Sequence, residues 1–524
     1  NVLEYLMHLF PQTAVHVAKL IAKKAQEKRH KATSAFSALG GSDDLSVATI
    51  AIVPLCFDST SDAQELCEFI TTKFEKIAPC KLMSRSIARQ YVGRRVFQNR
   101  NAVHEQKLSR LFCDIEESSR LTVYQADAKF TWWTKLCIQQ ADHVLLVVSA
   151  NNAPRCRQLE KYLSWASEKL MVRHIKVLIL QDVDAGNSNS EPVGDELNEW
   201  IEKQRWIEGQ HLARLPFDVH DMDIARLCRR IAGRSLGLAL GGGGARGLAH
   251  IGVIRALMER NVTVDVCGGT SQGAFVGALY AQSPDSYEDL VKNCRIMADN
   301  MASINKKLLD LTLPIVSYFN GVGFDNQIIE SIGKTTKFSD LILEFFCIST
   351  DLYRSSQVIH TKGLCWKYVR ASMSLCGYLP PVSEDGKLLA DGGYTNLVPG
   401  DILIEQMNAK AAICVDVAKE NPSDYYEYGT HISGLWLLLN SLNPFAKTVR
   451  VPSMGDLSQR LIWVSAFNHR SSLMDKVDLF LSPPVGNYGT LEFDKFDEIV
   501  EVGYQYAKPR VDAFISENPW VVSS

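Results

Sequence analysis

Residues 236–247 read LGLALGGGGARG and residues 262–275 read VTVDVCGGTSQGAF, and these two stretches decide the fold. Each begins with a short apolar run that is typical of a strand buried on both faces, and each run ends in glycines. Apolar residues near helical spacing follow, over 248–260 and 274–282. Two successive strand–turn–helix units predict a parallel α/β sheet, with both glycine turns at the carboxyl edge of the strands.

The first glycine turn is suited to bind an anion. Four consecutive glycines, residues 241–244, leave backbone N–H groups unshielded at the positive end of a helix dipole. The spacing G-x-G-x-x-G over 242–247, with Asp265 further on, also fits a dinucleotide-binding turn. A P-loop is excluded, because Leu248 follows Gly247 where a lysine is required. Taken alone, this turn does not separate a cofactor phosphate from a reaction oxyanion.

The second turn, residues 269–273, is a G-x-S-x-G motif with a predicted strand before it and a predicted helix after it. Gly269 and Gly273 are required because the backbone of so tight a turn has no room for side chains near Ser271. The serine hydroxyl is thereby exposed at a helix N-terminus, where the dipole favours the negative charge of a reacting oxygen. Since the two turns follow adjacent predicted strands, they predict a nucleophile beside N–H donors for its oxyanion. This interpretation takes precedence over the dinucleotide one.

Three motifs together resemble those of the patatin-like phospholipase family. They are G-G-G-x-R-G at 242–247, G-x-S-x-G at 269–273, and D-G-G at 391–393 after the apolar run 387–390. Within that family the chain is most similar to the neuropathy target esterase group, and the similarity covers almost the whole chain. The family's usual Asn-Asn-x-Pro after D-G-G reads NLVP here, at 396–399, so the second amide is lost.

The resemblance implies a Ser–Asp dyad without a histidine. In it, Asp391 accepts the Ser271 proton as the hydroxyl attacks an ester carbonyl. The residues agree with this, because His431 and His469, the two histidines after Asp391, lie in stretches that are more typical of the surface than of a base. The simpler interpretation of Asp391 is a turn former before two glycines. The backbone N–H groups of Gly243 and Gly244 are expected to hold the oxyanion, with Arg246 fixing the loop or adding positive field.

The expected site has four parts. They are the catalytic pair Ser271 and Asp391, the oxyanion hole Gly242, Gly243, Gly244, Arg246 and Gly247, the elbow glycines Gly269 and Gly273, and the acid-motif glycines Gly392 and Gly393. We expect no metal and no cofactor at this site.

The resemblance implies a serine esterase that releases fatty acid from lysophospholipids or phospholipids, of the lysophosphatidylcholine type. A neutral-lipid hydrolase or an acyltransferase with the same dyad is an alternative. A non-catalytic nucleotide-binding regulator is a third, and the G-x-S-x-G motif speaks against it. A net charge of −3 and the absence of any nucleic-acid fingerprint argue against nucleic acid as a partner. The expected partners are a lipid substrate and a membrane surface, and the sequence does not predict an oligomeric state.

Composition divides the chain into several parts. Short apolar runs alternate with helical stretches over 45–182, which predicts a small doubly wound α/β domain with strands at 47–55, 121–125, 143–149 and 174–181. The expected N-terminal segment, 1–40, is helical, and the resemblance implies that it ends an upstream cyclic-nucleotide-binding-like domain. The other expected segments are the accessory domain over 45–182, a linker and helices over 183–235, a patatin-like three-layer α/β catalytic core over 236–404, and a C-terminal extension packed on that core over 405–524.

The sequence also bears on location. Thirteen cysteines without a C-x-x-C pair favour reduced thiols, and so the cytosol or the cytosolic face of a membrane. No run approaches the roughly 18 apolar residues of a membrane span. Because the relatives carry an upstream transmembrane anchor, the resemblance implies the cytosolic face of an intracellular membrane, the endoplasmic reticulum. The basic stretch 19–31 and the apolar stretches 308–319 and 435–445 are candidates for lipid contact, but a solvated helix end and two core helices explain them more simply.

Overall fold

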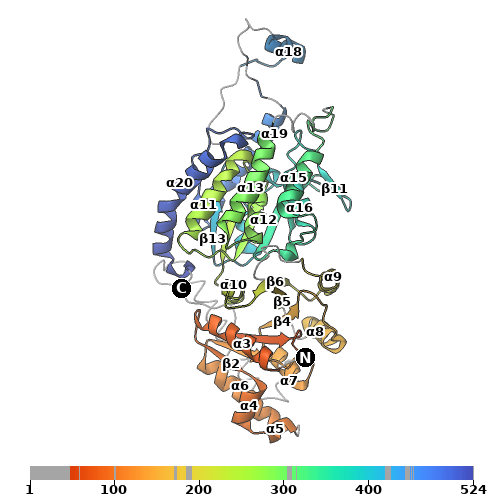
Figure 1. Cartoon of the computed structure of the whole chain (residues 1–524), viewed down its shortest axis with the longest axis vertical. Coiled ribbons are helices and arrows are strands. Elements are labelled where there is room, and N and C mark those ends of the chain that lie inside the picture. Colours follow the sequence, from red (N-terminus) through yellow and green to blue (C-terminus); the bar gives the residue numbers. More distant parts are fainter. Residues whose placement is uncertain are drawn as a thin grey trace.

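The computed structural model consists of two α/β domains in series, joined end to end along the long axis of the molecule (Figure 1). It describes residues 48–522 apart from 58–59, 99–101, 170–173, 184–191, 304–309, 314, 419–426, 443–448, 450 and 453. The predicted N-terminal segment 1–40 and its basic stretch 19–31 lie outside the described residues.

The first domain is a six-stranded parallel sheet of order β2-β3-β1-β4-β5-β6. Its strands are β1 Thr49–Pro54, β2 Cys80–Met83, β3 Leu121–Gln125, β4 His143–Ser149, β5 His174–Asp182 and β6 Gly209–Leu215. Its helices are α3 Thr60–Glu75, α4 Arg85–Val92, α5 Arg95–Gln98, α6 Ala102–Ser118, α7 Trp132–Gln140, α8 Arg157–Lys169, α9 Asp195–Lys203 and α10 Asp221–Ile231. All four predicted strands are present, and separate hydrophobic clusters cover the two faces of the sheet.

Two strands of this sheet, β2 and β6, were not predicted. They are its outermost strands, so neither needs a continuous apolar run, and the residues of β6 read GQHLARL. Because β6 belongs to this sheet, the predicted domain limit at residue 182 is too early. The range 183–235, predicted as a linker with helices, contributes a strand and two packed helices to the domain.

The second domain is an eight-stranded sheet of order β11-β12-β9-β8-β7-β13-β14, with β10 also paired to β9. The strands are β7 Leu236–Leu240, β8 Val266–Thr270, β9 Glu344–Asp351, β10 Ser356–His360, β11 Val382–Glu384, β12 Lys387–Asp391, β13 Ala411–Val415 and β14 Leu479–Leu481. The helices are α11 Ala249–Met258, α12 Gln272–Gln282, α13 Tyr287–Ala302, α15 Val322–Ile332, α16 Cys365–Ser372, α17 Gly400–Glu405, α18 Gly434–Leu442, α19 Met454–Met474 and α20 Phe496–Glu517. The neighbouring strands β9, β8, β7, β13 and β14 are parallel. Strands β10 and β12 each pair antiparallel with β9, and β11 pairs antiparallel with β12.

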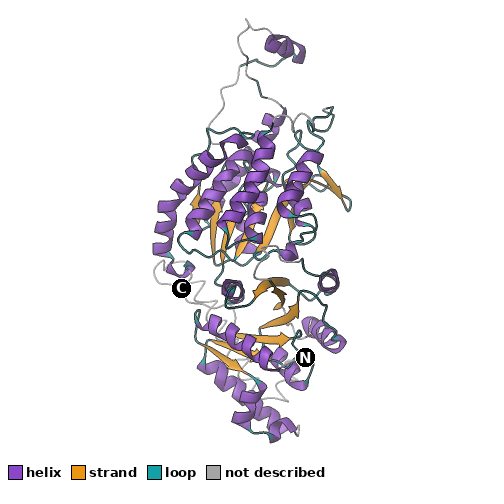
Figure 2. Ribbon diagram, viewed as in Figure 1, coloured by secondary structure: helices purple, strands orange, loops and turns teal. Residues whose placement is uncertain are grey.

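This sheet is the middle of three layers. The hydrophobic cluster on one face includes residues of α11 and α12, which lie in front of the strands in Figure 2, and the cluster on the other face includes residues of α17 and α19. Leu236, Leu238 and Leu240 of β7 point to the hydrophobic cluster on one face, and Ala239 points to the cluster on the other. The predicted three-layer α/β core is therefore confirmed.

The C-terminal region is part of this core and does not merely pack against it. Strand β13 lies beside β7 in parallel register, and β14 lies beside β13. Helix α20 packs against α11 at backbone distance, because a Cβ on Gly252 would collide with the Val500 carbonyl and one on Gly503 with the Ala249 carbonyl. The sheet of the catalytic domain thus continues past the predicted limit at residue 404.

Ion pairs tie the first domain to the second. Arg229 of α10 lies 2.7 Å from Asp265, Arg230 lies 2.6 Å from Glu344, and Arg226 lies 2.6 Å from Asp285. The Arg226 and Arg230 side chains are almost fully buried, which makes these contacts less screened than surface pairs.

In their described residues, neither apolar stretch named as a candidate for lipid contact forms a core helix. In 308–319, Leu311 pairs with Phe319 in an isolated bridge, and the side chains of Leu313 and Ile315 are exposed. In 435–445, α18 stands apart from the rest of the domain (Figure 1), and its Trp436 is exposed. No helix among the described residues combines the length and the apolar character that crossing a bilayer requires.

Candidate active site

Ser271 occupies a tight turn between β8 and α12. Its backbone has φ +55°, ψ −123°, a conformation that residues with a side chain rarely adopt and that costs about 1–3 kcal/mol. A Cβ on Gly269 would collide with the Gly273 carbonyl, and one on Gly273 would collide with the Leu240 carbonyl. The turn is held from outside as well, because the Ser271 N–H donates to Ser372 Oγ at 2.8 Å.

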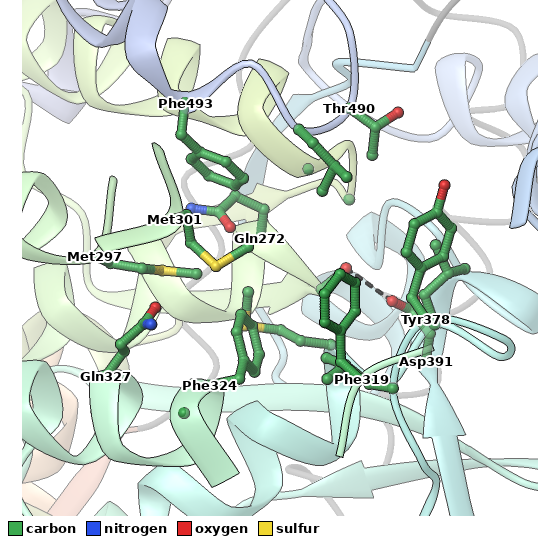
Figure 3. A pocket seen from close by; sticks show the side chains of 18 of the residues that line it. Gln272, Met297, Met301, Phe319, Phe324, Gln327, Tyr378, Asp391, Thr490 and Phe493 are labelled. Atoms are coloured by element: carbon green, nitrogen blue, oxygen red, sulfur yellow. Dashed lines mark hydrogen bonds between the residues drawn. The ribbon is translucent and has the colours of Figure 1, made fainter. Parts of the chain in front are cut away.

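Asp391, at the end of β12, lies next to this serine. The Ser271 hydroxyl donates to Asp391 Oδ2 at 2.8 Å, and the Gly393 N–H donates to Asp391 Oδ1 at 2.8 Å (Figure 3). Gly392 also lacks room for a side chain, because a Cβ there would collide with the Ile348 carbonyl. Burial raises the pKa of Asp391 to about 6, although the two donated hydrogen bonds act to lower it. A carboxyl group with this pKa and this contact can take a proton from the hydroxyl near neutral pH.

The glycine turn after β7 lies beside Ser271, but its four N–H groups are not equivalent. The Gly241 N–H donates to Val415 O at 2.9 Å and the Gly242 N–H donates to Leu397 O at 3.2 Å. The N–H groups of Gly243 and Gly244 have no acceptor among the described residues, and both residues line the same cavity as Ser271. Gly242 instead allows the glycine turn to lie close to Ser271, because a Cβ on Gly242 would lie 3.0 Å from Ser271 Cβ.

Two further members of the predicted oxyanion hole lie elsewhere. Arg246 is buried, and its guanidinium carbon lies 5.2 Å from the centre of the Trp463 ring. Its Nη1 lies 3.5 Å from the Tyr488 carbonyl, so it ties the loop to the C-terminal region, and burial lowers its pKa to about 10. Gly247 makes room for a neighbour, since a Cβ there would lie 2.5 Å from Gln272 Cγ. Of the glycine-turn residues named from the sequence, the geometry leaves Gly243 and Gly244 as donors.

His250, in the first turn of α11, was not identified from the sequence. Its Nε2 donates to the Gly241 carbonyl at 2.7 Å, and burial lowers its pKa to about 4, so the ring is neutral. The histidine fixes the start of the glycine turn. No sequence signal distinguishes it from any other residue of that helix.

The other candidates from the sequence do not join the site. Asp265, where a ribose-binding acid would stand, is buried and accepts from Arg229 and from the Leu236 N–H. His431 lies beside α18 in an exposed loop, and the backbone of His469 lies in α19. No histidine belongs to the described cavity wall around Ser271 and Asp391. Nor do the described residues contain a group of three or more His, Cys, Asp or Glu placed to hold a metal ion.

A cavity of about 610 Å³ opens beside Ser271 and Asp391. Its size is within the usual range for a ligand pocket. The wall is mainly apolar and comes from α13, α15, the loop before α15 and the C-terminal region (Figure 3), with side chains that include Met297, Met301, Phe319, Phe324 and Phe493. Of these five, Phe319 ends the stretch 308–319 that was named from the sequence as a candidate for lipid contact. The other four were not named, because they come from separate elements with no common motif.

Comparison with known proteins agrees with this arrangement. Residues 238–404 match the model of the patatin-like phospholipase family, and residues 46–234 match that of the neuropathy target esterase family P-loop like domain. Patatin-like phospholipase domain-containing protein 7 of Rattus norvegicus is 36% identical over 97% of this chain, which covers 39% of that protein. Protein 6 of Homo sapiens is 35% identical over 97% of this chain, covering 38% of that protein, and lysophospholipase NTE1 of Pyricularia oryzae is 36% identical over 81%, covering 30%.

The chain thus spans well under half the length of these relatives. The two family models together account for most of its residues, and Ser271 and Asp391, which meet in the structure, both lie within the range of the first model. The chain therefore carries a patatin-like phospholipase domain over residues 238–404, preceded by a neuropathy target esterase family P-loop like domain over residues 46–234.

Proposed function

We propose that this chain is a serine esterase that hydrolyses the acyl ester of lysophospholipids or phospholipids. The observation that carries the proposal is the 2.8 Å hydrogen bond from Ser271 Oγ to the buried carboxylate of Asp391, at the wall of an apolar cavity. A nucleophile, a base and space for an acyl chain are thereby available in one place. The names of the relatives, phospholipase and lysophospholipase, support the same class of substrate.

In the proposed mechanism, Asp391 takes the hydroxyl proton as Ser271 Oγ bonds to the ester carbonyl carbon. The carbonyl oxygen becomes an oxyanion and accepts hydrogen bonds from the N–H groups of Gly243 and Gly244. The bond to the glycerol oxygen then breaks, and Asp391 returns the proton to that leaving oxygen. Water, deprotonated by Asp391, attacks the acyl-enzyme, and the fatty acid leaves as Ser271 regains its proton.

A lipid panel tests the substrate class. We expect the purified chain to release fatty acid from lysophosphatidylcholine or phosphatidylcholine, measured by mass spectrometry of both products. Faster release from triacylglycerol would favour a neutral-lipid hydrolase with the same dyad. Transfer of the acyl group to an added lipid alcohol in place of water would favour an acyltransferase. Failure to release an acyl group from any ester would contradict the proposal.

The glycine turn gives a prediction of its own. In Gly243→Ala the new Cβ would lie 2.6 Å from Val417 Cγ2, so the turn must shift and carry its N–H away from the oxyanion. We expect kcat to fall about 100-fold to 1,000-fold, the usual effect of losing one oxyanion donor. Gly486→Ala is the matched control, because no atom lies within 4 Å of its added Cβ. Equal kcat in both variants would remove Gly243 from the chemistry.

We also propose that the chain works at a membrane surface, on the cytosolic face of an intracellular membrane such as the endoplasmic reticulum. Its thirteen cysteines are all free, in keeping with a reducing compartment. Exposed apolar side chains lie close in sequence to the cavity wall. Leu313 (78% exposed) and Ile315 (88%) precede the wall residue Phe319, and Leu461 (66%) adjoins the wall residue Ile462. Apolar burial at the interface would place the cavity against the lipid.

Vesicle flotation checks this proposal. We expect Leu313→Asp together with Ile315→Asp to weaken binding to phosphatidylcholine vesicles at high salt, because each change puts a charge where apolar burial is needed. Trp436→Asp is expected to weaken the same salt-resistant binding. Val103→Asp, at an exposed apolar position on α6 of the other domain, is the control. Binding that none of these variants alters would contradict a role for this surface.

A further inference from the structure

Gln272, the residue after the proposed nucleophile, has a side-chain amide without a partner. It is 1% exposed, and neither its Oε1 nor its Nε2 has a hydrogen-bond partner among the described residues. Buried polar groups in folded proteins almost always have one, and an exception calls for an explanation. The side chain belongs to the wall of the cavity that contains Ser271 and Asp391, near Met301 and Phe493 (Figure 3).

The backbone around this amide is built to hold it there. Gln272 is the first residue of α12, so its backbone is fixed by the helix. Its Cβ and Cγ pass over Gly247, where an added Cβ would lie 2.8 Å and 2.5 Å from these two atoms. Gly247 thus leaves the space through which the side chain of Gln272 reaches the cavity wall. The unpaired amide destabilises the protein when no ligand is bound, and a ligand that supplies the missing hydrogen-bond partner would remove this cost.

We propose that Gln272 forms a polar subsite that binds a hydroxyl group of the substrate. An amide offers both a donor, Nε2–H, and an acceptor, Oε1. A hydroxyl group can accept from the first and donate to the second, so it satisfies both orphaned atoms. A second ester group in the same place can only accept, which leaves Oε1 unpaired. The subsite thus favours a hydroxyl-bearing lipid over its deoxy or esterified counterpart. This inference rests on the proposed function of Ser271 and Asp391.

The hydroxyl can come from two sources. One is the free glycerol hydroxyl of a monoacyl phospholipid, and the other is a hydroxyl on the acyl chain itself. Three esters distinguish them: lysophosphatidylcholine, its analogue with hydrogen in place of the glycerol hydroxyl, and that same deoxy analogue carrying a hydroxyacyl chain. The lipid that loses most when the amide is removed identifies the source.

The decisive variant is Gln272→Met, which keeps the unbranched shape that passes over Gly247 but has no amide. We expect the wild type to prefer a hydroxyl-bearing ester over the plain deoxy ester by about tenfold or more in kcat/KM, and the variant to lose this preference. Gln282→Met makes the same change at the far end of α12, where Nε2 donates to Ile332 O at 3.3 Å, and should keep the preference. Gly247→Ala, which displaces the amide, should also reduce it.

Thermal stability separates this role from a structural one. Because Gln272→Met removes two unpaired buried atoms, its Tm should equal or exceed that of the wild type. A lower Tm with an unchanged preference would make the amide structural and overturn the proposal.

A binding measurement tests the subsite without turnover. Calorimetry on the Ser271→Ala protein should show tighter binding of the hydroxyl-bearing lipid, and Ser271→Ala/Gln272→Met should bind both alike. If the Ser271→Ala protein discriminates between the lipids but the wild type hydrolyses neither, the proposed function is wrong and the subsite remains supported. If the wild type hydrolyses the esters but the Ser271→Ala protein does not discriminate, the subsite is wrong and the proposed function remains supported.

Discussion

Ser271→Ala is expected to abolish ester hydrolysis and leave the fold intact. Among the described residues, the variant lacks the one hydroxyl that donates to the Asp391 carboxylate, because the Thr350 hydroxyl donates to the backbone carbonyl of Asp391 instead. Loss of a serine nucleophile costs about 10⁴-fold to 10⁶-fold in kcat in well-studied hydrolases. The backbone at this position keeps its strained φ of +55° with either side chain, so stability should change little. Fatty-acid release and labelling by a fluorophosphonate probe measure the result.

Two other serine variants sharpen this test. Ser283→Ala, just after the C-terminal end of α12, is the matched control and should keep both activity and labelling. Ser271→Gly should be as inactive as Ser271→Ala but more stable, because glycine adopts a positive φ without strain. If Ser271→Ala retains more than a few per cent of wild-type turnover, another residue attacks the ester and the proposed mechanism is wrong.

The sequence predicted the central strands well because their surroundings are simple. Strands β3, β4 and β7 have the predicted limits, since strands buried on both faces read as continuous apolar runs. The edge strands β2 and β6 escaped detection because the outer edge of a sheet tolerates polar residues. The domain limit at residue 182 shifted for the same reason, whereas the limit at residue 404 excluded β13, an interior strand that is wholly apolar. A limit drawn at the last apolar run omits the strand that completes the sheet.

At the site, a motif predicts which residues come together, but it does not predict the direction of each group. Gly242, Gly243 and Gly244 are indistinguishable in sequence, yet the Gly242 N–H is already bonded to the Leu397 carbonyl, from a segment more than 150 residues away in the chain. Arg246 looks like an anion ligand in the motif, but it faces Trp463 of the C-terminal region. These assignments depend on long-range contacts, which no local pattern encodes.

The two apolar stretches show a limit of a different kind. A run of leucines with one tryptophan is equally compatible with a core helix and with an exposed one, since composition alone does not supply a partner. Helix α18 has no packing partner among the described elements in Figure 1, and Leu439 on it is exposed. The expectation of core helices was wrong because it was based on hydrophobicity without periodicity.

Asp391→Asn is expected to reduce kcat by about 10³-fold to 10⁴-fold, because the amide cannot take the Ser271 proton and the contribution of a positioned base is of this order. Folding should survive the change. The Asp391 pKa of about 6 lies above its ordinary value of 3.8, so ionisation of the buried carboxyl destabilises the folded state above about pH 6 and has no effect on stability below 3.8. The Tm of Asp391→Asn should therefore equal or exceed that of the wild type at pH 7, and the advantage should disappear as the pH falls.

The pH profile completes the argument for Asp391. If its carboxylate is the base, kcat/KM of the wild type should rise with pH through about 6 and then level off, since the free enzyme must carry the ionised form. The residual activity of Asp391→Asn should lack this limb, because no group with that pKa remains in contact with Ser271. His431→Ala, a change in an exposed loop, should keep both the limb and the plateau. A profile that keeps its limb in Asp391→Asn and loses it in His431→Ala would assign the base to the histidine and replace the dyad by a triad.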